Sequence, residues 1–246
     1  MIDIHPPQHT PITRRDFFIH LGIVVLGILI AIALEQSVEA LHQAHQRAEL
    51  RQALAHESQQ ILKDCRDSEK ESTADLAWAT AMGQQLSDAA RLHHPVGLAR
   101  PFPPSTANIP DDPIFRAAAA SNQLALLSRS EIVSYSEVDS LLTQYRVLDQ
   151  NAHKAYADYF HFQLAQTFAK PPGTLPFDGT SLQDLKTAYT LQGAGAASIQ
   201  QLQRWARVIQ GAEVAVSSGE RDLLKIQASE IKYISQPSPA PPTEKP

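Results

Sequence analysis

Residues 17–34 read FFIHLGIVVLGILIAIAL and are apolar throughout except for His20. At about 1.5 Å of rise per helical residue, this stretch is roughly 27 Å long, which nearly matches a hydrocarbon core of about 30 Å. Arg14 and Arg15 precede it, and a positive flank favours the cytoplasmic side. We therefore expect residues 14–34 to form a transmembrane anchor in a cell inner membrane, in contact with lipid through residues 17–34 and with a cytoplasmic N-terminus.

The same residues allow a second interpretation. The stretch TRRDFF at 13–18 also resembles a twin-arginine export signal, for which Ala31-Ile32-Ala33 would be the cleavage site. The residues after Leu34 favour the anchor, because Val38 and Leu41 continue the helical spacing and no proline or glycine interrupts it. Both interpretations place residues 35–234 on the extracytoplasmic side.

Composition narrows the class of protein. The chain has 246 residues, 19% of them charged, and only 10 glycines, which favours a folded helical domain. A formal net charge of −5, with no basic cluster beyond Arg14 and Arg15, argues against a nucleic-acid partner. Cys65 is the single cysteine, so no internal disulfide can form. Its helical position predicts a small, buried, apolar role.

The distribution of proline divides the chain. Residues 1–13 contain three prolines and predict a disordered cytoplasmic leader, and residues 235–246 predict a disordered proline-rich tail. Between the anchor and the tail we expect one helical extracytoplasmic domain, residues 35–234. A proline-rich break at residues 93–113 interrupts it.

Capping signals predict the helices on either side of that break. The first helix is expected to leave the membrane and run to about Leu92. Asp112-Pro113 is expected to open a second helix, which runs to about Ser128. Ser130 or Ser136 is expected to begin a third helix, which the segment 170–173 stops.

The last helix is expected to begin at Ser181, with one continuous apolar face from Leu182 to Ile226. Gly193 and Gly195 within it suggest a bend or a close helix contact. The fold class is therefore all-α: an N-terminal transmembrane helix that continues into an extracytoplasmic antiparallel bundle of three to four long helices.

The membrane segment carries a further pattern. Gly27 and Ala31 form a small-xxx-small pair that would let two such helices approach closely. The stretch GILIAIALEQ at 27–36, after the Arg-Arg flank, resembles a group of bacterial single-pass membrane proteins with a domain of unknown function. Residues 115–127 are similar to their mid-chain pattern, although Phe115 and Asn122 stand where a tryptophan and a glycine are typical. The resemblance implies an architecture and a location, not an activity.

Metal chemistry has one candidate motif. Glu39 and His42 have the Glu-x-x-His spacing that di-iron bundles use, and Asp158 with His161 is a partial second copy. Such sites also need two further carboxylates, and Glu39 lies close to the expected membrane surface. His42 with His45, and the His93-His94 pair, are interpreted as surface residues. We therefore predict no metal site.

Other catalytic motifs are missing from the sequence. It contains no G-x-S-x-G elbow, no phosphate-binding loop and no G-x-G-x-x-G fingerprint. The short Gly193-Ala-Gly195 run lacks the preceding strand that a dinucleotide site needs. We predict neither catalytic nor cofactor-binding residues, no cofactor, and no enzymatic activity.

One aromatic-rich segment stands out. Its side chains are Tyr145, Tyr156, Tyr159, Phe160 and Phe162. Packing in the core is the first interpretation, and a ligand or partner groove is the alternative.

The sequence as a whole predicts a membrane-anchored helical binding or scaffold protein. Its expected partner is a second copy of the chain or another membrane protein. The alternatives are a small-molecule-sensing bundle that acts through a partner and a metal-dependent enzyme.

Overall fold

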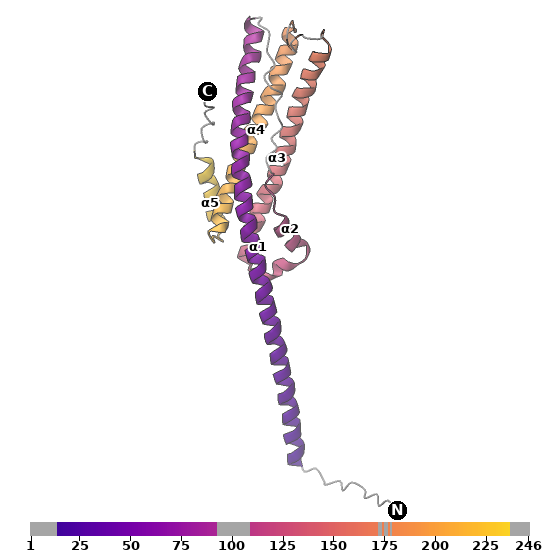
Figure 1. Ribbon diagram of the computed structural model, residues 1–246. Helices are drawn as coiled ribbons and strands as arrows, with labels where there is room; N and C mark the ends of the chain where they lie inside the picture. The colour runs from indigo at the N-terminus through magenta and orange to yellow at the C-terminus, as the bar shows by residue number, and fades with distance from the viewer. Residues whose placement is uncertain (1–13, 93–108, 172–173, 175–176, 178, 237–246) are drawn as a thin grey trace, which may run out of the picture. The chain divides into compact units, whose positions relative to one another are not determined.

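The computed structural model describes residues 14–92, 109–171, 174, 177 and 179–236. The expected leader at 1–13, the break at 93–108, the His93-His94 pair and the tail from 237 lie outside these residues. The described residues form helices and no strands, so the all-α prediction is confirmed (Figure 1). In chain order the elements are α1 (Arg14–Leu92), α2 (Pro113–Ala120), the 3-10 helix η1 (Gln123–Leu126), α3 (Arg129–Phe168), α4 (Leu182–Ser217) and α5 (Leu223–Ile234).

The chain divides into two compact units, Met1–Arg51 and Gln52–Pro246. In the first unit, the N-terminal part of α1 exposes the apolar side chains of residues 17–34. Among the described residues, α1 is the one helix long and apolar enough to cross a membrane; its most apolar 18-residue window has a mean hydropathy of 2.8, and none of that window is buried. A signal sequence near an N-terminus has the same length and composition.

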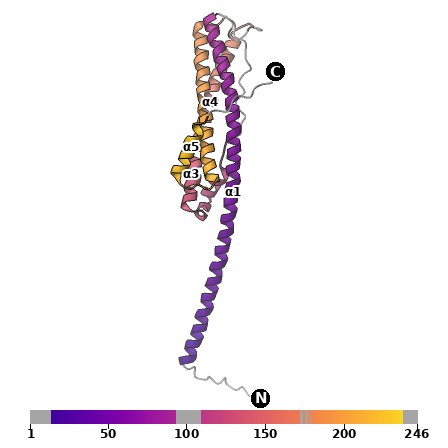
Figure 2. The same ribbon diagram turned by 90° about the vertical axis from the view of Figure 1, so that its left-hand side faces the viewer.

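Four helices share the core of the second unit. Buried residues of α1, α3, α4 and α5 form its larger cluster, which includes Cys65 with no exposed surface, as predicted. Figures 1 and 2 show α3 and α4 side by side, with α5 against α4. A second cluster joins Met82 and Leu86 of α1 to Tyr159 of α3 and Leu185 of α4. Each helix has a narrow apolar stripe, so its burial depends on the other three.

The start of α3 differs from the prediction. Ser128, not Ser130 or Ser136, is its N-cap, and the Ser128 hydroxyl accepts a hydrogen bond from the Glu131 backbone N–H. The Glu131 carboxylate in turn accepts the Ser128 backbone N–H at 2.8 Å. This reciprocal capping box satisfies two donors at once, which favours a start at Ser128. The helix ends at Phe168, just before the predicted stop.

Helix α2 is shorter than expected. It ends at Ala120 instead of Ser128, because Asn122 takes a left-handed conformation with φ of 62° and η1 follows. Asp112 stands at the N-cap, but its side chain makes no cap hydrogen bond. Glu57 of α1 takes that role: its two carboxylate oxygens accept the backbone N–H groups of Ile114 and Phe115 at 2.5 and 3.1 Å.

The predicted last helix is two helices. Its start at Ser181 is confirmed, since the Ser181 hydroxyl accepts the Asp184 backbone N–H. The continuous face to Ile226 is wrong, because the chain turns at Gly219, whose φ is 93°. That conformation is accessible to glycine at little cost. Asp222 then caps α5 by accepting the Leu224 backbone N–H.

The close helix contact lies at a different glycine from those suggested by the sequence. A Cβ atom on Gly193 or Gly195 would meet nothing within 4 Å. A Cβ atom on Gly211 would lie 2.7 Å from Glu230 Cα and 2.8 Å from the Ser229 carbonyl oxygen. Gly211 therefore lets the backbone of α5 pack directly on α4.

Candidate functional site

The residues of the Glu-x-x-His motif make local contacts on α1. Gln43 Nε2 donates to Glu39 Oε1 at 2.8 Å, and Gln46 Nε2 lies 2.9 Å from His42 Nε2. His45 is 3.1 Å from Glu49. All are one helical turn apart on exposed surface, which is the ordinary geometry of helix-face pairs.

The partial second copy is also used locally, with Asp158 3.1 Å from Lys154. Glu39 and His42 belong to the first unit, and Asp158 and His161 to the second. Throughout the part of the chain that the structure describes, no three His, Cys, Asp or Glu side chains gather in a group that would hold a metal ion. The described residues thus supply no ligand set for the metal-enzyme hypothesis.

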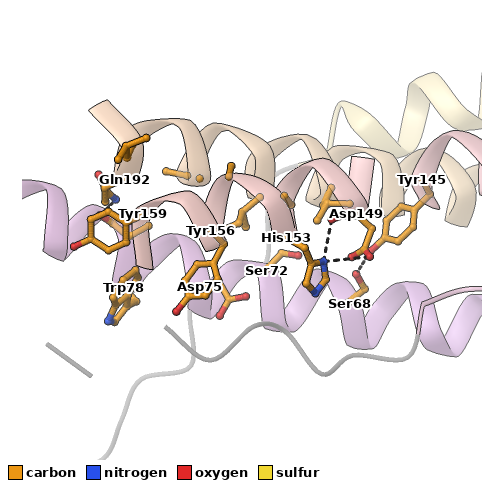
Figure 3. A pocket seen from close by; sticks show the side chains of 18 of the residues that line it. Ser68, Ser72, Asp75, Trp78, Tyr145, Asp149, His153, Tyr156, Tyr159 and Gln192 are labelled. Carbon is orange, nitrogen blue, oxygen red and sulfur yellow. Dashed lines mark hydrogen bonds and ion pairs between the residues drawn. The ribbon is translucent and has the colours of Figure 1, made fainter. Parts of the chain in front are cut away.

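A pocket of about 130 Å³ lies in the second unit, between α1, α3 and α4 (Figure 3). For scale, an engineered cavity of about 150 Å³ admits benzene. Its lining residues from α1 and the segment before α2 are Ser68, Ser72, Asp75, Trp78, Ala79 and Ile109. From α3 they are Tyr145, Asp149, Ala152, His153, Ala155, Tyr156 and Tyr159, and from α4 Leu191, Gln192, Gly195, Ala196, Ile199 and Leu202.

The helical repeat explains this lining. On α3, residues 145, 149, 152, 156 and 159 recur every three or four positions and therefore share one face. On α4, Gly195 and Ala196 have little or no side chain, which leaves space on that side of the pocket.

The predicted aromatic segment therefore divides between two roles. Tyr145 and Tyr159 are both buried in the core and part of the pocket wall. Tyr156 lines the pocket while half-buried, and Phe162 packs on the second core cluster. The core interpretation and the groove alternative each describe part of the segment.

The polar groups of the pocket differ in whether they have a hydrogen-bond partner. The Tyr145 and Ser68 hydroxyls are hydrogen-bonded to each other, and Gln192 Nε2 donates to the Ala79 carbonyl oxygen. The Tyr159 side chain is only 4% exposed, and its hydroxyl has no hydrogen-bond partner among the described residues. A buried hydroxyl without a partner costs free energy, which a ligand with a complementary atom would recover.

Two carboxyl groups face the same space. Burial raises the pKa of Asp75 to about 6, and the nearby charge of Glu71 adds to the effect. Burial also raises the pKa of Asp149, which His153 opposes. His153 Nδ1 lies 3.3 Å from the Asp149 carboxylate and 2.9 Å from the Asp149 carbonyl oxygen.

The phenols of the pocket are neutral at physiological pH. Burial raises the pKa of Tyr156 to about 12, with a contribution from the charge of Asp75. Burial likewise raises the pKa of Tyr159 to about 12. These two side chains therefore offer aromatic faces and hydroxyl groups, not negative charge.

This arrangement is suited to binding. It combines aromatic faces, carboxylates and a buried hydroxyl without a partner, all held by helices. Sequence reasoning missed Asp75, Trp78, Asp149 and Gln192. The three-four spacing on α3 was a usable signal for Asp149, but the opposing residues come from α1 and α4, and nothing in the sequence pairs those helices.

Comparison with known proteins finds no match among protein-family models, curated proteins or solved structures. The proposed function therefore rests on the pocket itself.

Proposed function

We propose that this chain is a membrane-anchored helical binding protein that holds a small molecule in the pocket between α1, α3 and α4. The observation that carries the proposal is the pocket of about 130 Å³, walled by the four rings of Trp78, Tyr145, Tyr156 and Tyr159. Concave sites with apolar walls and a few polar groups are the usual form of small-molecule sites.

The proposed setting is the inner membrane. Residues 17–34 would cross the bilayer, the N-terminus would lie in the cytoplasm, and residues 35–234 would form an extracytoplasmic antiparallel bundle. The Arg14-Arg15 flank and the apolar length support this topology. The Gly27–Gln36 stretch supports kinship with bacterial single-pass proteins, and the Gly27–Ala31 face would suit a second copy or a membrane protein partner. Such a partner would receive any signal from ligand binding.

A reporter fusion tests the topology. Alkaline phosphatase fused after Ile234 is expected to be active, because the enzyme needs disulfides that form outside the cytoplasm. Full-length chain should stay in the membrane fraction through an alkaline wash. An inactive fusion, with a cytoplasmic reporter active at the same position, would reverse the orientation. A chain whose mass begins near Glu35 would replace the anchor by a cleaved signal.

Filling the pocket tests the binding. Gly195 lines the pocket, and a Cβ atom there meets nothing within 4 Å, so Gly195→Leu is expected to fill part of the cavity. Gly193→Leu is the matched control, since Gly193 has equal space on the same helix but is not part of the lining. The probes are benzyl alcohol, benzylammonium, choline and 3,3-dimethylbutan-1-ol.

Binding of each probe to the full chain in mild detergent is measured by isothermal titration calorimetry. We expect at least one probe to bind to the native chain and to Gly193→Leu. Gly195→Leu should weaken that binding by at least about tenfold, or about 1.4 kcal/mol. If no probe binds, or if both leucine variants bind like the native chain, the pocket is not a small-molecule site.

A further inference from the structure

The charged side chains that line the pocket favour a ligand with a positive charge. Asp75 comes from α1 and Asp149 from α3, and no lysine or arginine is among the described lining residues. His153 is the only nitrogen base among them, and it is already close to Asp149. Within the described residues, no ion pair involves Asp75. The carboxylate of Asp75 is thus half-buried, and no cation among the described residues balances it.

An aromatic ring lies beside the same carboxylate, and further rings line the same pocket. Figure 3 shows Asp75 beside the ring of Tyr156, with Trp78 and Tyr159 further along the pocket. The charge of Asp75 acts on Tyr156, which agrees with their closeness. The face of an aromatic ring is electron-rich and attracts a cation, and rings arranged as a cage recognise quaternary ammonium groups.

The buried hydroxyl of Tyr159 is an independent sign of a ligand. It is among the lining residues, its side chain is 4% exposed, and the hydroxyl has no partner among the described residues. A ligand that carries a hydroxyl or an N–H group would supply the missing hydrogen bond.

We propose that the ligand is a small organic cation, an amine or a quaternary ammonium compound, bound with its charged nitrogen against Asp75 and the rings of Trp78 and Tyr156. Its apolar part fills the space beside Gly195 and Ala196. This inference rests on the proposed function, since it names the ligand of the same pocket.

Charge excludes the other classes. An anion would meet two carboxylates and, among the described lining residues, no basic side chain other than His153, so it would be disfavoured. A neutral apolar molecule would desolvate those carboxylates without forming a compensating interaction, which costs free energy. A cation would compensate the desolvated carboxylate by direct charge attraction. It would also interact favourably with the electron-rich faces of the rings. The volume suits a molecule of about the size of benzene, such as choline.

Two pairs of probes separate charge from shape. Choline and 3,3-dimethylbutan-1-ol differ by a positive nitrogen in place of a carbon, and benzylammonium and benzyl alcohol are the second pair. Each is titrated into the full chain in mild detergent. We expect the cation of at least one pair to bind at least about tenfold more tightly than its neutral partner. Asp75→Asn should remove that preference by weakening the binding of the cation.

Asp67→Asn is the matched control. Asp67 is also on α1, it is 55% exposed, and it pairs with Lys63 at 3.8 Å outside the pocket. It should keep the preference for the cation.

The outcomes distinguish this inference from the proposed function. Equal affinity within both pairs, with binding lost in Gly195→Leu, would overturn the inference of a cationic ligand. It would still support the pocket as a small-molecule site. A cation preference that survives Asp75→Asn would place the cation elsewhere and overturn the inference too. No binding by any of the four probes would overturn both.

Discussion

Glu69→Ala is expected to lower the free energy of unfolding of the second unit by about 4 kcal/mol, because it leaves a buried charge without its partner. Arg207 Nε donates to Glu69 Oε1 at 2.6 Å, and the two side chains are only 10% and 13% exposed. Gln210 Nε2 donates to the other Glu69 oxygen at 3.2 Å. The variant would leave Arg207 with the Gln236 carbonyl oxygen, which accepts from Nη1 at 2.8 Å. Folded domains have only about 5–15 kcal/mol of stability, so this loss is large.

Tryptophan fluorescence during urea unfolding of the full chain in detergent measures the effect. Both tryptophans, Trp78 and Trp205, belong to the second unit and report on it alone. Asp158→Ala is the control, because its pair with Lys154 is exposed and should contribute less than about 1 kcal/mol.

A double variant separates the charge from the packing. Glu69→Leu combined with Arg207→Met should recover most of the loss, since it removes both charges together. If Glu69→Ala cost no more than Asp158→Ala, the pair would be screened by solvent, and its burial would add nothing to its strength.

Glu213→Gln is expected to make the second unit more stable at pH 8 and to leave it almost unchanged near pH 4.5. Glu213 of α4 is 1% exposed. Burial raises the pKa of its carboxyl from 4.5 to about 7; Ser58 opposes this through a hydrogen bond, and the charges of Glu57 and Asp112 add to it. One oxygen of the carboxyl has no hydrogen-bond partner among the described residues.

The raised pKa in the folded state sets the direction of this effect. Below pH 4.5 the carboxyl is protonated in both states, and its contribution to stability is fully present. Between pH 4.5 and 7 the unfolded chain loses the proton first, so stability falls as pH rises through about 7. At about 1.4 kcal/mol for each pKa unit, the loss reaches roughly 3 kcal/mol above pH 7. The amide of the variant does not titrate and avoids this loss.

Urea unfolding at pH 4.5, 6 and 8 measures this effect as the difference between the variant and the native chain. Glu220→Gln is a control of opposite sign. Hydrogen bonds from the backbone N–H groups of Asp222 and Arg221 lower the pKa of Glu220. That contribution is present above pH 4.5 and is lost as the pH falls, so the variant should be the less stable chain at pH 8. A Glu213→Gln difference that is constant with pH would show that the Glu213 carboxyl has the same pKa in the folded and unfolded states, and would contradict the raised pKa.

The sequence predicted those helix boundaries whose signals are local. The start at Ser181 and the end before Lys170 depend on residues within a few positions of each other, and both predictions are confirmed. Ser128 was equally local, as its hydroxyl and the Glu131 carboxylate are three residues apart, but the prediction chose later serines. The turn at Gly219 was not predicted, because the apolar face of α4 continues in the sequence into α5 and conceals it.

The sequence could not predict the cap of α2. Glu57 precedes Ile114 by 57 residues, and only the packing of α1 on α2 brings its carboxylate to the free N–H groups. The same holds for Arg207 and Glu69, which are 138 residues apart. A side chain that acts across helices leaves no periodic signal on either one.

The sequence by itself determined that the chain is helical, that its first helix contains an exposed apolar stretch of membrane length, and that Cys65 is buried. Each of these properties depends on the periodicity and hydrophobicity of neighbouring residues. Only the tertiary structure decided where the pocket lies, because its wall takes Asp75 from α1, Tyr159 from α3 and Gly195 from α4. The physical reason is that helical spacing fixes which residues share a face, whereas the choice of the opposing face depends on the packing of the whole core.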